Sequence, residues 1–123
     1  MRSIFIYIAV LFFSFSFSQK KELRQIKRLI DEKFFQEAES TLESNKDFLL
    51  SGDSKTDAQY YYYATKIYTE IKSFKLAKNS LEELMSINPS YYNAEMKLDY
   101  KNLEEILVVA LVNAAVADNS SKK

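Results

Sequence analysis

The chain has 123 residues with 17 basic and 17 acidic side chains, and it contains one Gly, one Pro, no Cys and no His. This charge balance provides no strongly basic face of the kind that nucleic-acid binding requires. One Gly is too few for a Gly-rich phosphate loop, and the lack of Cys and His excludes zinc sites, thiol nucleophiles and Ser-His-Asp triads. Scarce Gly and Pro also argue against a turn-rich β fold, so the composition predicts a small all-α protein that is not an enzyme and needs no cofactor or metal.

The N-terminal segment, residues 1–18, has the three parts of a secretory signal. A basic residue precedes an apolar run, Ile4–Phe13, and the small residues Ser16 and Ser18 occupy the third and first positions before a cut. This pattern predicts a signal peptide over residues 1–18, cleaved before Gln19, and hence a periplasmic or extracellular protein. The alternative is an uncleaved anchor, although the apolar run is shorter than the about 20 residues that span a bilayer.

Residues 57–90 carry the clearest helical pattern in the chain. The run Thr56-Asp57-Ala58-Gln59 has the form of a capping box and predicts that a helix starts there. Asn88-Pro89 predicts the end of a second helix, because the residue before proline disfavours the α conformation. Between them, two stripes of apolar residues at steps of three and four are separated by Lys72-Ser73: Tyr61, Ala64, Tyr68 and Ile71, then Phe74, Ala77, Leu81 and Leu84. Two such helices form an antiparallel hairpin.

The order of these residues resembles the tetratricopeptide repeat, a 34-residue helical-hairpin family. The residues that correspond to the family pattern are Tyr61, Ala64-Thr65, Tyr68, Ala77, Leu81 and Pro89. Tyr replaces the usual Trp, Ala-Thr replaces Leu-Gly, and Leu replaces Phe. The resemblance implies a short α-solenoid of antiparallel helix pairs, in which Tyr61 packs between helices and Ala77 lies where two helices cross closely.

Two further units are less complete copies of the first. Leu29, Ala38 and Leu42 precede Tyr68, Ala77 and Leu81 by one constant interval, which is longer than the family's repeat because of an insertion around Ser51-Gly52. Asp31-Glu32-Lys33 interrupts this upstream stripe. In the other direction, a step of about 34 residues, the repeat length of the family, lands on the apolar residues Leu98, Leu111 and Ala115. The sequence therefore predicts a repeat domain over 19–118, with units at about 19–52, 57–90 and 91–118, followed by a polar tail at 119–123.

The resemblance also implies a concave groove that holds peptides. Its positions here are Lys20, Lys27, Gln59, Tyr62, Lys66, Asn93 and Tyr100. Lys27 and Lys66 would hold a peptide carboxylate, as carboxylate-clamping members of the family do, whereas the alternative is that both lysines only solvate the surface. Of the four consecutive tyrosines at 60–63, at most two can enter the core, and an exposed tyrosine is a good binding residue.

The stretch Ile106–Ala117 contains one polar residue, Asn113, so a helix there has no polar face and must be covered. A second copy of the chain, an earlier helix folded against it, or further chain beyond Lys123 would each provide the cover. The residues predicted for this hydrophobic interface are Leu107, Val109, Leu111 and Val112.

Taken together, these patterns predict an exported bacterial interaction module that binds a peptide or partner protein. One alternative is the periplasmic sensory repeat segment of a longer signalling protein. Another is a structural homodimer joined through the C-terminal helix. A nucleic-acid partner and a metal are excluded by the composition.

Overall fold

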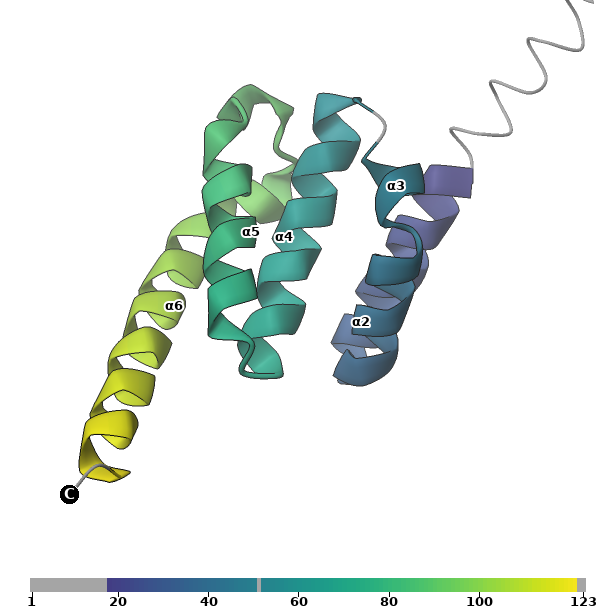
Figure 1. The fold of residues 1–123 in the computed structure, drawn as a ribbon. Coiled ribbons are helices and arrows are strands. Elements are labelled where there is room, and N and C mark those ends of the chain that lie inside the picture. The colour runs from purple at the N-terminus through teal and green to yellow at the C-terminus, as the bar shows by residue number, and fades with distance from the viewer. Residues whose placement is uncertain (1–17, 51, 122–123) are drawn as a thin grey trace, which may run out of the picture.

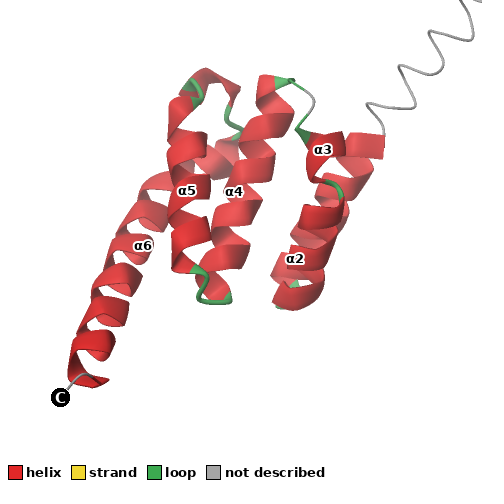
Figure 2. Cartoon of the chain, in the orientation of Figure 1, coloured by secondary structure: helices red, strands yellow, loops and turns green. Residues whose placement is uncertain are grey.

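The computed structural model describes residues 18–50 and 52–121 of the chain. Nearly all of the predicted signal peptide, residues 1–17, lies outside the described residues. The described part contains helices and no strand, which confirms the all-α class (Figure 2). After an N-terminal helix at 18–31, the elements are α2 (Phe35–Ser44), α3 (Lys46–Leu49), α4 (Ser54–Glu70), α5 (Phe74–Ser86), the short 3₁₀ helix η1 (Pro89–Tyr91) and α6 (Ala94–Ser121).

Helix α4 is the centre of the fold. It contacts α2, α3, α5, α6 and η1, and it runs antiparallel beside α5 (Figure 1). Because helices cover α4 on several sides, three of its four consecutive tyrosines are buried: Tyr60, Tyr62 and Tyr63. Only Tyr61 is partly exposed, so the prediction that at most two of the four enter the core is wrong.

Two turns have the same backbone conformation. One joins the N-terminal helix to α2, and the other joins α4 to α5. Lys33 and Lys72 both have φ of 65°, the left-handed conformation found at the end of many helices. The N–H of Phe34 donates to the carbonyl of Leu29 at 2.8 Å, and the N–H of Ser73 donates to that of Tyr68 at 2.9 Å. This bond from the residue after the left-handed position closes the helix end and turns the chain back.

The two turns show that the interval from Ala38 to Ala77, read from the sequence, recurs in the backbone. Each donor and acceptor of the first turn has its counterpart at the same interval in the second, as have the N–H groups of Ala38 and Ala77, which donate to Phe34 and Ser73. Ala38 and Ala77 are both fully buried. The predicted breaks near Lys33 and Lys72 are therefore confirmed, as is the end of the second helix before Pro89.

The start of α4 differs from its prediction. The helix begins at Ser54, ahead of the predicted capping residue, Thr56. The Thr56 hydroxyl donates to the carboxylate of Asp53 at 2.8 Å, so it lies inside the first turn instead of capping it. Asp53 occupies the N-terminal cap position without a side-chain hydrogen bond to the backbone.

The predicted third helix pair, over residues 91–118, does not form. Residues Ala94–Ser121 make one continuous helix, which takes in positions 119–121 of the expected polar tail. No Gly or Pro lies between these ends to break it. As a result the C-terminal part of α6 extends past the turn between α4 and α5, where α5 begins (Figure 1).

Replacing Lys72 with Gly tests the proposed turn geometry. Gly adopts positive φ without the steric cost that Lys carries, so Lys72→Gly is expected to stabilise the fold by about 1 kcal/mol. A chemical unfolding curve measures this change. Lys97→Gly, at an exposed position within α6, is the matched control and should destabilise by about 0.5–1 kcal/mol. Destabilisation by both variants would contradict the turn geometry.

Candidate functional site

The predicted groove positions lie mainly on one surface formed by the N-terminal helix, α4 and the start of α6. Successive turns of the two earlier helices contribute equivalent residues, such as Lys20 with Gln59 and Lys27 with Lys66, and α6 adds two carboxylates. We call this surface the polar face; its residues are Lys20, Arg24, Lys27, Gln59, Tyr63, Lys66, Glu95 and Asp99.

The two lysines predicted to hold a peptide carboxylate are paired with carboxylates of the chain itself. The Lys27 ammonium lies 3.5 Å from the Glu95 carboxylate. The Lys66 ammonium lies 4.0 Å from Glu95 and 3.5 Å from Asp99. The structure therefore brings Lys27 and Lys66 to one place, as the resemblance implies, but α6 already supplies the acidic groups there. A peptide carboxylate would compete with Glu95 and Asp99 for these lysines.

Tyr62 belongs to the same cluster but is not a surface residue. Its side chain is 1% exposed, and its hydroxyl donates to the Asp99 carboxylate at 2.7 Å. The Lys66 ammonium lies 4.9 Å from the centre of the Tyr62 ring, within the range of a cation–π contact. Burial and then the bond to Asp99 raise the pKa of Tyr62 above its ordinary value. Tyr62 thus joins α4 to α6, and its predicted exposure in a groove is wrong.

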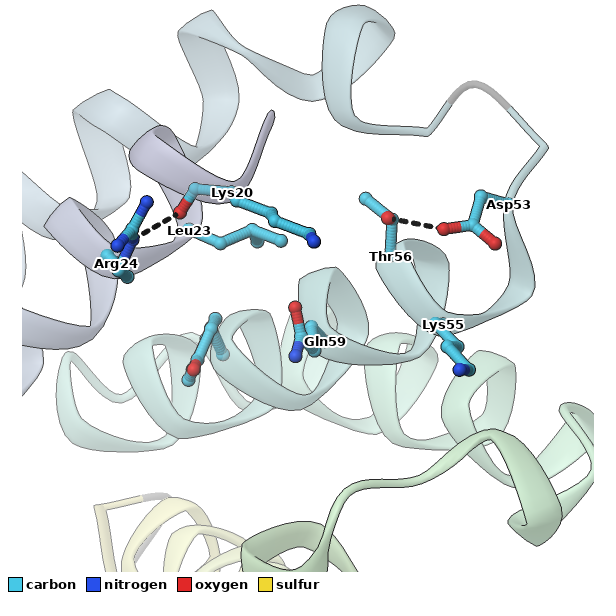
Figure 3. A pocket seen from close by; sticks show the side chains of 8 residues that line it. Lys20, Leu23, Arg24, Asp53, Lys55, Thr56 and Gln59 are labelled. Carbon is cyan, nitrogen blue, oxygen red and sulfur yellow. Dashed lines mark hydrogen bonds between the residues drawn. The ribbon is translucent and has the colours of Figure 1, made fainter. Parts of the chain in front are cut away.

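The other end of the polar face is an open pocket of about 430 Å³ between the N-terminal helix and the first turns of α4 (Figure 3). Gln59 lines it, as does Tyr63, and burial raises the pKa of Tyr63 to about 12. The remaining lining residues, of which three are basic and one acidic, are Lys20, Leu23, Arg24, Asp53, Lys55 and Thr56. The Arg24 side chain donates to the carbonyl of Lys20 at 3.3 Å.

Two predicted groove residues have structural roles elsewhere. The Asn93 side-chain oxygen accepts from the N–H of Met96 at 2.9 Å and so caps the first turn of α6. Tyr100 is partly buried, with its ring 5.9 Å from that of Tyr92 in an edge-to-face contact. The capping role of Asn93 was recognisable in the sequence, because Asn directly before a helical segment is a preferred cap.

The predicted hydrophobic interface divides between two sides of α6. Leu107 is 3% exposed and Leu111 is partly buried against the core. Val109 and Val112 are 58% and 55% exposed. Only the last two are therefore available to a partner.

Three further aliphatic residues of the stretch Ile106–Ala117, which were not among the four predicted interface residues, are exposed as well. With Val109 and Val112 they form what we call the outer face of α6: Ile106, Val108, Val109, Val112 and Val116, each more than half exposed. Fully burying one aliphatic side chain contributes about 1.5–3 kcal/mol, so covering the exposed half of all five contributes about 4–7 kcal/mol. Contiguous exposed apolar surface of this kind marks interaction sites.

Comparisons with known proteins leave the interpretation to the geometry. No family model, no curated protein and no solved structure matches this chain. Within residues 18–50 and 52–121, none of the helices has the length and apolar character needed to cross a membrane. The same residues contain no cluster of acidic side chains arranged to hold a metal ion.

The buried tyrosines of α4 predict how stability depends on pH. Burial raises the pKa of both Tyr60 and Tyr63 to about 12, from the ordinary value of 10.0. The unfolded chain releases these protons near pH 10 and the folded chain holds them to higher pH. Their contribution to stability is therefore complete below pH 10 and is lost as the pH rises from 10 to about 12.

Urea unfolding at several pH values between 8 and 12 tests this expectation. Each tyrosine should add about 1.4 kcal/mol per pH unit to the decline above pH 10. The double variant Tyr60→Phe, Tyr63→Phe cannot lose these protons and should show a shallower decline. Equal slopes for the two proteins would show that these hydroxyls are not held neutral by burial.

Proposed function

We propose that this chain is a non-enzymatic protein-interaction module, a short exported helical-repeat protein of the tetratricopeptide type that binds a partner protein. The observation that carries the proposal is the outer face of α6, where five aliphatic side chains are more than half exposed on one helix. Leaving them in water forgoes the energy that a partner surface would supply.

The helical-repeat part of the proposal is supported by the two equivalent turns. The left-handed residues Lys33 and Lys72 and the buried alanines Ala38 and Ala77 recur at the same interval. The N-terminal helix with α2, and α4 with α5, are then two units of one array. In this proposal α6 stands where the first helix of a third unit belongs.

The polar face is a weaker candidate for the partner surface. Its central lysines, Lys27 and Lys66, are already paired with Glu95 and Asp99, and Tyr62 is buried beneath them. A ligand would compete with these carboxylates for the two lysines. We therefore place the partner on α6.

Export and cleavage before Gln19 are part of the same proposal. The Gln19 side chain is buried, and its amide donates to the carbonyl of Phe48 at 2.8 Å. This contact ties the predicted first residue of the mature chain to α3, so that cleavage at this position would leave the packed helices complete.

Photo-cross-linking from the outer face tests the proposal in the source organism. A benzoylphenylalanine at Val109 or Val112 should give a cross-linked product, whereas the same group at the exposed Lys75 of α5 should give none. Val112→Asp combined with the probe at Val109 should abolish the product. Products of equal yield from all three probe positions, or none from any, would contradict the proposal.

A stability measurement tests whether Val112→Asp abolishes the cross-linked product without unfolding the protein. Val112→Asp changes an exposed side chain and should shift the free energy of unfolding by no more than about 0.5 kcal/mol. Leu107→Asp places a charge in the core and is expected to unfold the protein. If Val112→Asp unfolded it too, the outer face would be part of the core and not a partner surface.

A further inference from the structure

We infer that the partner on the outer face of α6 is a second copy of this chain, with the two α6 helices paired antiparallel and crossing near Val112. This inference rests on the proposed function of the outer face. It adds the identity of the partner and the direction in which it lies.

The spacing of the outer face fits a helix as the partner. Val109, Val112 and Val116 follow one another at steps of three and four, the pattern with which one helix packs along another. Elsewhere in the fold, α4 has the antiparallel α5 beside it. Among the described residues no helix takes the corresponding place beside the outer face of α6, since its residues are exposed.

The charges near this face favour a second copy over a charged partner. From Ile106 to Ala117 the helix carries no charged side chain that would select a complementary surface. An apolar stripe matches an identical stripe, which is what a two-fold interface requires. The whole chain has a formal net charge of zero at pH 7, so two copies do not repel each other at long range.

Two acidic residues next to the outer face favour an antiparallel over a parallel pair. Glu104 and Glu105 lie directly before the outer face and are exposed. A parallel pair would bring four carboxylates together, whereas an antiparallel pair places them at opposite ends.

Sedimentation velocity of the chain, expressed in full and purified from the compartment where it accumulates, tests the inference. At tens of micromolar we expect a dimer. Val112→Asp should weaken the dimer by about 100-fold or more while leaving a folded monomer. Leu76→Asp, at an exposed leucine of α5, is the matched control and should leave the dimer intact. Val116→Lys, one turn further along the outer face, is a second variant and should weaken the dimer as well.

The absence of native cysteines makes the direction measurable with single spin labels. Labels at Lys101→Cys should lie about 33 Å apart along the helix axis in an antiparallel pair that crosses at Val112, since each residue rises about 1.5 Å. Labels closer than about 20 Å would overturn the antiparallel arrangement.

The outcomes separate this inference from the proposed function. A dimer that Val112→Asp does not split overturns the inference. A monomer at every concentration overturns it as well, and if Val109 still cross-links to a different protein, the proposed function stands without it. A monomer with no cross-link from Val109 contradicts both.

Discussion

Each described α-helix buries one set of apolar side chains against neighbouring helices, and the fold depends on the turns that bring those neighbours back. The left-handed residues Lys33 and Lys72 reverse the chain, and Ala38 and Ala77 are buried directly after them. Small side chains at these points let the paired helices approach closely. Apolar side chains that no neighbouring helix covers stay exposed, as on the outer face of α6.

The sequence was sufficient for the features that depend on local pattern. Apolar spacing predicted the helices and the breaks at both turns, and the equivalence of Ala38 with Ala77 predicted the interval that the hydrogen bonds confirm. It failed where the result depends on how many neighbours a helix has. Tyrosines on more than one side of α4 are buried, because α4 lies between other helices. The third pair was expected from length and step size, although no residue breaks α6.

Most of the candidate site was predicted as a set of positions but not as a set of contacts. The resemblance placed Lys27, Tyr62 and Lys66 together, and in the structure each of them contacts Glu95 or Asp99 of α6. Their partners Glu95 and Asp99 come from a helix much later in the chain, and no local pattern relates them to the lysines. Lys27 and Lys66 of the polar face are therefore paired within the chain, while the outer face of α6 leaves apolar surface uncovered. Because of this contrast, we expect the partner to bind the outer face of α6 and not the predicted groove.

Amide hydrogen exchange along α6 tests most directly whether the second half of this helix relies on a partner. Residues 96–107 pack against the core through Met96, Leu103 and Leu107, so their amides should be protected at every protein concentration. Residues 108–117 should be protected at high concentration and should exchange faster on dilution, or in Val112→Asp. Equal protection of both halves at high dilution and in the variant would contradict the account, because the chain alone would then stabilise the whole helix.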